Sequence, residues 1–126
     1  SRRVHEVRKS GFPIIFGDAA KTIILEAADL KRAKLLLITT PVAVISLGIV
    51  AHAQRINPGI RIIARAEGEE QMKALYTKGV TYVVQPEFEA SLEIVNQTLL
   101  NLGIPAEQFK TFTEDARQEL HRPLSV

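Results

Sequence analysis

Hydrophobic positions gather in four short runs along the chain, and each run precedes a longer segment in which apolar residues recur at helical spacing. The runs cover residues 13–16, 35–38, 61–64 and 81–84. Each is too short for a helix, and the intervals between them accommodate one strand, one helix and two loops. Uninterrupted apolar runs such as LLLI are typical of strands buried on both faces of a parallel sheet. The pattern therefore predicts an α/β fold with a parallel sheet covered by helices.

Helices are expected where one side of a segment is apolar. Helical spacing places such stripes at Ile23, Ala27 and Leu30, at Val42, Ile45 and Ile49, at Met72, Leu75 and Tyr76, and at Phe88, Leu92, Val95 and Leu99. Gly79 and Gly103 follow the last two stripes and are expected to end those helices. A proline then starts a further helical segment, whose apolar side carries Phe109, Phe112, Ala116 and Leu120. We therefore divide the chain into an α/β unit at residues 1–103 and a C-terminal helical tail at residues 104–126.

Residues 35–54 carry no charged side chain and are about long enough to span a bilayer, so a membrane helix is the alternative for this stretch. Pro41 follows a β-favouring run and two threonines, and proline interrupts helices. The stretch is therefore predicted to divide into a short buried strand and a separate buried helix.

Composition narrows the class of protein. A chain of 126 residues, 46% of them hydrophobic, suffices for one globular domain. Cysteine is absent, which excludes disulfides, thiolate metal sites and cysteine nucleophiles and suits a reducing compartment. The formal net charge of +2 is a small basic excess, so nucleic acid is not an expected partner. Because the chain opens on Ser1 without a signal-like apolar stretch, we expect a cytoplasmic fragment of a longer polypeptide.

A βα array of this kind normally opens with a strand that leads into a glycine-rich turn. In a doubly wound sheet that turn holds the phosphates of a dinucleotide, and an acidic residue ending the second strand binds a ribose. The sequence contains no G-x-G-x-x-G, and its first residues, SRRVHEVRKSG, are typical of the last turns of a helix. We therefore expect a Rossmann-like parallel sheet that lacks its first two strands.

Four segments in order resemble the RCK domain, also called the TrkA N-terminal (TrkA-N) domain: GFPIIFGDAAKTIILEAADLKRAKLLLITT, RINPGIRIIARA, KGVTYVVQPEFEASLEI and LLNLGIPAE. The resemblance runs from about Val4 to about Leu120 and is closest to the cytoplasmic regulatory part of Kef-type and other monovalent cation:proton antiporters. It implies a Rossmann-like domain that binds NAD(H) or an adenine nucleotide and passes a conformational signal to a membrane transporter or channel. It implies no catalysis.

The same resemblance places Gly17, Asp18 and Ala19 at the corner after the family's third strand, which lines the adenosine side of the pocket. The chemistry agrees, because glycine lets the backbone approach a ligand and a short carboxylate accepts hydrogen bonds from an amine or a ribose hydroxyl. The alternative role for Asp18 is to cap the following helix, and the two roles are compatible.

Three further residues are expected at the carboxyl edge of the sheet, where ligands bind in such folds. Thr39 and Thr40 end the second predicted strand, and Arg65 follows the third. Many family members continue after the threonine position with an acidic, Asn-containing helix start, whereas this chain has PVAVIS, which weakens a ligand role for the residues that follow. Arg65 either faces a phosphate with its bidentate fork or forms a salt bridge with Glu67 or Glu69.

No set of side chains indicates an enzyme. Glu87 and Glu89 could serve acid-base or metal chemistry, but at the start of a predicted helix they more often complement its dipole. The three histidines lie far apart without metal-ligand spacing. The favoured function is a ligand-sensing regulatory domain of a potassium or monovalent cation transporter, at the cytoplasmic face of the membrane. A dehydrogenase-like Rossmann enzyme and a purely structural dimerisation module are the alternatives.

Three further expectations follow from the absence of the first two strands. The strands at 35–38, 61–64 and 81–84 should be parallel neighbours, whereas the strand at 13–16 should lie apart or pair with another chain. The open edge of the 35–38 strand then favours a homodimer or higher homo-oligomer that exchanges elements and uses the tail helix. Because one wall of the pocket is missing, this chain alone should bind NAD(H) or ATP weakly or not at all, although the intact domain binds.

Overall fold

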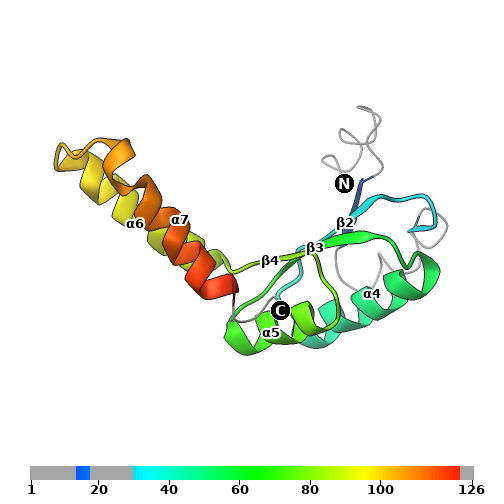
Figure 1. Ribbon diagram of the computed structural model, residues 1–126. Helices are drawn as coiled ribbons and strands as arrows, with labels where there is room; N and C mark the ends of the chain where they lie inside the picture. The colour runs from blue at the N-terminus through cyan, green and yellow to red at the C-terminus, as the bar shows by residue number, and fades with distance from the viewer. Residues whose placement is uncertain (1–13, 18–29, 123–126) are drawn as a thin grey trace.

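The computed structural model describes residues 14–17 and 30–122, in which four strands form one parallel sheet in the order β1-β2-β3-β4. The strands are β1 (Ile14–Gly17), β2 (Leu35–Ile38), β3 (Arg61–Arg65) and β4 (Tyr82–Val84). Helices α4 (Ala43–Ile56) and α5 (Glu69–Thr77) connect β2 to β3 and β3 to β4, and both lie on the same face of the sheet (Figure 1). The predicted fold class, a Rossmann-like α/β domain with a parallel sheet, is confirmed.

The hydrophobic core lies between this sheet and the two crossover helices. Every second residue of β2 and β3 is buried, among them Leu36 and Ile62. They belong to one cluster with Val50 of α4, Leu75 of α5 and Val83 of β4, each at most 1% exposed. Full burial of such side chains contributes roughly 1.5–3 kcal/mol each. The core therefore fixes the relative positions of β2, β3 and β4.

The stripe predicted for α4 is confirmed at Ile49 and wrong at Val42 and Ile45. Val42 lies at the N-cap and is 48% exposed, and Ile45 is only partly buried. The buried residues are Ser46, Ile49, Val50 and Ala53. The stripe is shifted because Ser46 is small and its hydroxyl donates to the Thr40 carbonyl, which lets a polar residue occupy the core side. The stripe predicted for α5 is confirmed, because Met72 and Leu75 are fully buried.

Helices α6 (Pro86–Asn101) and α7 (Ala106–His121) form a hairpin that projects away from the sheet (Figure 1). Leu92 and Phe109 are buried within it, whereas Phe112, expected on the same side as Phe109, is 55% exposed. The predicted domain boundary at residue 103 falls in the turn of this hairpin, and the division itself stays a prediction.

Two glycines end helices as predicted. Gly79 has φ 91° after α5, and Gly103 has φ 82° after α6. In both turns the residue after the glycine donates its N–H to a carbonyl five positions earlier, Val80 to Leu75 and Ile104 to Leu99. Glycine favours these positions because a side chain is strained at positive φ.

The predicted placement of the first strand is wrong. β1 pairs in parallel with β2, with Ile14 opposite Leu35 and Gly17 opposite Ile38. In the doubly wound order two other strands stand between these two; here β1 itself supplies partners for the N–H and C=O groups along that edge of β2. The edge of β2 is therefore not open, which removes the reason given above for an exchange of elements between chains.

The uncharged stretch at residues 35–54 divides between β2 and α4, as predicted. Within residues 14–17 and 30–122, no helix combines the length and apolarity that crossing a bilayer requires.

Candidate functional site

A hollow of about 220 Å³ lies at the carboxyl edge of the sheet. Its lining consists of Leu37, Ile38, Thr39, Ile63, Ala64, Arg65, Val84 and Pro86. Parallel strands end at one edge, so β2, β3 and β4 each contribute their last residues, and α6 contributes its first. Leu37, Ile63 and Val84 alternate with the buried core positions and so belong to the face of the sheet opposite α4 and α5.

The hollow combines an apolar floor with two polar side chains. The floor consists of Leu37, Ile63 and Val84, and Thr39 and Arg65 are the two polar residues of the lining. Ligand pockets of this composition bind molecules through apolar contact and use a few polar groups to orient them. The arrangement suits a ligand that is planar and apolar at one end and anionic at the other.

Of the two contacts expected for Arg65, a phosphate or a salt bridge, the structure contains the salt bridge, with Glu67. Its Nη2 and Nε lie 3.0 Å and 3.2 Å from Oε1 of Glu67, and the two side chains are 42% and 45% exposed. A pair this exposed contributes about 0–1 kcal/mol because water screens it. An anion entering the hollow would therefore displace Glu67 from Arg65 at small cost, and the predicted phosphate contact stays a prediction.

The two threonines after β2 have different surroundings. Thr39 is exposed and lines the hollow. Thr40 is buried: its Oγ1 accepts a hydrogen bond from the Val42 N–H at 3.3 Å, and its carbonyl accepts one from Ser46 Oγ at 3.3 Å. Thr40 therefore fastens the start of α4, and it does not belong to the lining.

The glycine-aspartate-alanine corner is described only in part. Gly17 ends β1 and is aligned with Ile38, so its backbone stands at the same edge as the hollow. Asp18 and Ala19 lie outside the described residues, and their predicted contact with adenosine stays a prediction.

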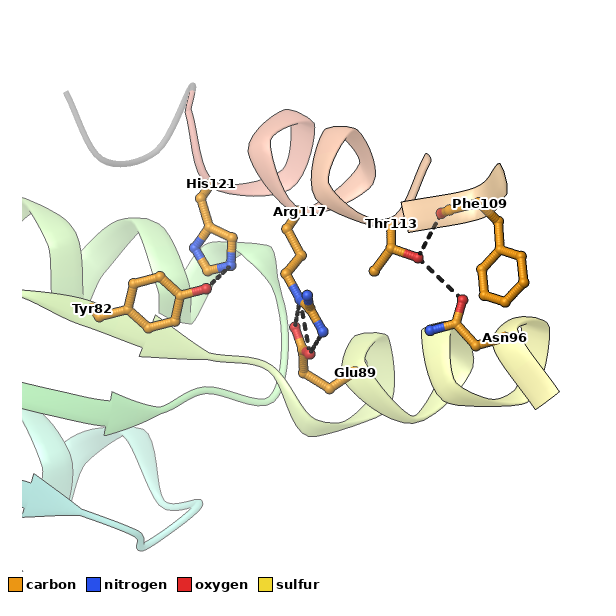
Figure 2. A network of polar contacts seen from close by, with 7 residues as sticks. All are labelled: Tyr82, Glu89, Asn96, Phe109, Thr113, Arg117 and His121. Atoms are coloured by element: carbon orange, nitrogen blue, oxygen red, sulfur yellow. Dashed lines mark hydrogen bonds and ion pairs between the residues drawn. The ribbon is translucent and has the colours of Figure 1, made fainter. Parts of the chain in front are cut away.

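The acidic residues at the start of α6 lie where they complement the helix dipole, which is one of the two roles expected for them. Glu87 and Glu89 both lie in its first turn. Glu89 also accepts three hydrogen bonds from Arg117 of α7, at 2.7, 3.1 and 3.2 Å (Figure 2). This contact, mainly through its hydrogen bonds, raises the pKa of Arg117. In the described part of the chain, no group of three His, Asp or Glu side chains is arranged to hold a metal ion.

Sequence reasoning missed the apolar floor. The sequence predicted strands that are buried on both faces, and this gave no reason to distinguish Leu37, Ile63 and Val84 from their neighbours. The period-two alternation within each strand, combined with knowledge of which face the crossover helices cover, would have separated them.

The sheet, its crossover helices and the hollow at the carboxyl edge define the class of Rossmann-like α/β domains. Residues 1–86 match the TrkA-N domain family, and the chain belongs to this family. The match ends at Pro86, where α6 begins.

Solved structures that are similar to this chain include a Kef C-terminal domain and a second TrkA-N domain. The first is the Kef C-terminal domain of Shewanella denitrificans in its AMP-bound form, which is 28% identical to this chain. The match covers 86% of this chain and 69% of the Kef chain, with a TM-score of 0.71. The TrkA-N domain of the inner membrane protein YbaL from Escherichia coli is 36% identical over 80% of this chain and 71% of that chain, with a TM-score of 0.53. The predicted resemblance to the TrkA-N domains of Kef-type proteins is thereby confirmed.

Proposed function

We propose that this chain is a ligand-sensing regulatory domain of a Kef-type monovalent cation transporter, and that an adenine nucleotide binds in the hollow at the carboxyl edge. The observation that carries the proposal is that Thr39 and Arg65 line the same hollow as the apolar floor. Membership of the TrkA-N family and similarity to a Kef C-terminal domain with bound AMP support it.

The chemistry of the hollow fits the parts of a mononucleotide. The base lies on Leu37, Ile63 and Val84, the phosphate is bound by Arg65 once Glu67 is displaced, and Thr39 is near the ribose. Ligand pockets usually measure roughly 300–1,000 Å³, so a hollow of about 220 Å³ takes part of a nucleotide. This size agrees with weak binding of NAD(H) or ATP by this chain.

The position of Pro86 offers a way for a ligand to act on the rest of the molecule. Pro86 lines the hollow and is also the first residue of α6, which carries the projecting hairpin. A ligand that contacts Pro86 differently in two orientations of the hairpin would shift the balance between them. The proposed output is therefore a change in hairpin orientation that a membrane transporter senses, with no catalytic step.

The nucleotide site is tested by calorimetric titration of AMP, ATP and NADH into the wild type, Arg65→Ala and Arg61→Ala. Arg61 is the matched control, because it begins β3 at the opposite edge of the sheet and is exposed. Loss of a charge-assisted hydrogen bond of about 1.5–3 kcal/mol weakens binding roughly ten- to a hundredfold. We expect this loss of AMP affinity for Arg65→Ala alone. Equal affinity in all three proteins would refute the site.

Removing the contact between Arg65 and Glu67 should change the affinity for AMP in the opposite direction. Glu67→Gln removes the carboxylate that competes with a phosphate for Arg65, so AMP should bind several-fold more tightly. The same change at Glu69, an exposed residue in the first turn of α5, should have a much smaller effect. Weaker binding by Glu67→Gln would mean that Glu67 itself contacts the ligand.

Self-association belongs to the same proposal, and exposed apolar side chains on the hairpin favour it. Ile94, Leu102 and Phe112 are 68%, 71% and 55% exposed. A second copy that covers these side chains would remove them from water. Light scattering at micromolar concentration should give a dimer, and Phe112→Ser should weaken it. A dimer indifferent to all three nucleotides would instead favour a purely structural module, and turnover of a nucleotide would favour an enzyme.

A further inference from the structure

The end of α7 returns to the sheet, where His121 lies between two tyrosines. Its Nδ1 is 2.7 Å from the hydroxyl oxygen of Tyr76 on α5, and its Nε2 is 3.3 Å from that of Tyr82 on β4. The His121 and Tyr82 rings stack with centroids 4.7 Å apart (Figure 2), and Tyr76 meets the imidazole edge-on at 6.0 Å. Two side chains of the α/β unit thus hold the last residue of the tail helix.

The hydrogen bonds around Tyr76 favour the neutral form of His121 that carries its proton on Nε2. The Tyr76 hydroxyl accepts a hydrogen bond from the Val83 N–H at 3.1 Å, and its own proton is then available for Nδ1 of His121. In the arrangement that gives this proton a partner, Nδ1 is the acceptor, and the proton of the neutral imidazole is on Nε2. A second proton on Nδ1 would face the Tyr76 O–H, and one of these donors would lose its partner.

The charges near the imidazole do not offset this mismatch. Glu89 of α6 acts to raise the pKa of His121 and Arg117 of α7 to lower it, and these two side chains are paired with each other. Burial is the largest influence and lowers the pKa of His121. Burial also raises the pKa of Tyr76, which keeps its hydroxyl protonated as a donor.

The contact lies at an edge of the sheet. β4 is the last strand in the order, and the Tyr76 hydroxyl is the partner of its Val83 N–H. One residue further, Val84 lines the hollow, and α6 begins at Pro86. Both ends of the hairpin are thus joined to β4, by the chain at Pro86 and by His121 at the end of α7.

We propose that His121 is a pH-sensitive latch, which docks the end of α7 on the sheet edge while the imidazole is neutral and releases it on protonation. The latch rests on the contacts of Tyr76, Tyr82 and His121 and is independent of the nucleotide site. Because the docked imidazole has a pKa below its ordinary value of 6.5, the docked state binds fewer protons than the released state. Docking is therefore strongest above the ordinary pKa and weakens as the pH falls from there through the docked pKa.

The composition of the chain allows a direct optical test. The protein has two tyrosines and no tryptophan, and both tyrosines contact His121, so its intrinsic fluorescence reports on the latch. Between roughly pH 5 and pH 7, we expect a transition in the wild type that is lost in His121→Gln. His52→Gln is the matched control: His52 lies on α4, its Nδ1 contacts Arg55, and its replacement should leave the transition unchanged.

Release is measured separately from protonation by amide hydrogen exchange, expressed as protection factors at the two ends of that pH range. We expect protection of the last turn of α7 and of Val83 to fall at low pH in the wild type and to be independent of pH in His121→Gln. Tyr82→Phe, which keeps the stacked ring and removes the longer hydrogen bond, should retain the transition. A fluorescence transition with unchanged protection, or the full transition in His121→Gln, would overturn the latch.

Discussion

The core and the hairpin are stabilised in different ways. Between the sheet, α4 and α5, large apolar side chains such as Leu36, Ile62 and Leu75 are at most 1% exposed. In the hairpin, burial is limited to Leu92 and to the side of α7 that carries Phe109 and Thr113. Thr113 donates to Asn96 at 3.1 Å, and Arg117 pairs with Glu89 (Figure 2).

This difference indicates which part of the molecule is able to change its arrangement. Close-packed apolar cores have few alternative packings of similar energy, so the core acts as a rigid base. Half-exposed polar contacts contribute little each and can be replaced by water, so the hairpin can be repositioned at small cost. Matched substitutions in the two regions test this contrast.

The largest effect is expected from removing a buried leucine. Leu75→Ala leaves a cavity beneath the sheet and should reduce the free energy of unfolding by about 2–5 kcal/mol. Leu102→Ala, at a residue 71% exposed near the hairpin turn, should change it by less than about 0.5 kcal/mol. Urea unfolding at a protein concentration low enough to keep the chain monomeric measures both. Similar losses would show that the hairpin contributes to the core, against the contrast drawn here.

An intermediate effect is expected at the two helix-ending glycines. Alanine at either position is strained by positive φ, which costs about 1–2 kcal/mol. At Gly79 the new Cβ would also stand 3.2 Å from Nε2 of Gln54, which donates to the Lys78 carbonyl at 2.6 Å, whereas nothing lies within 4 Å at Gly103. Gly79→Ala should therefore cost a further ~0.5–1.5 kcal/mol, the value of one hydrogen bond. Equal losses in urea unfolding would mean that Gln54 moves aside freely.

The same contrast explains how much of the fold the sequence predicted. The predicted bounds of the strands agree with the structure to within one residue, because short uninterrupted apolar runs occur mainly in buried strands. The position of β1 was predicted wrongly because strand order depends on which edge is available for pairing, which no local pattern records. Phe112 was assigned to the apolar side of the tail helix, yet spacing alone cannot tell a buried aromatic residue from an exposed one.

The candidate site was predictable where a residue follows directly from a strand end. Thr39 and Arg65 meet in the hollow because parallel strands end at one edge. Thr40 has the same sequence context as Thr39, but the alternation of side chains turns it toward the start of α4. The cluster around His121 was not predictable, because its members come from a crossover helix, an edge strand and the tail, and only the docking of α7 brings them together.

The smallest effect is expected for the ion pair that joins the two helices of the hairpin. Arg117 contacts both carboxylate oxygens of Glu89, but the side chains are 42% and 31% exposed, so water screens most of their attraction. A double-mutant cycle of Arg117→Ala and Glu89→Ala should give a coupling energy of about 0.5–1 kcal/mol that shrinks as salt is added.

Arg65 and Glu67, at the rim of the core, are the matched control pair, since Arg65 contacts one oxygen of a carboxylate two residues away. Their coupling should be smaller still, because neighbours in sequence remain close together in the unfolded chain. A larger coupling for Arg65 and Glu67 would show that the bidentate contact of Arg117 with Glu89 adds little stability, and the hairpin would then depend on Phe109 and Leu92 rather than on its polar contacts.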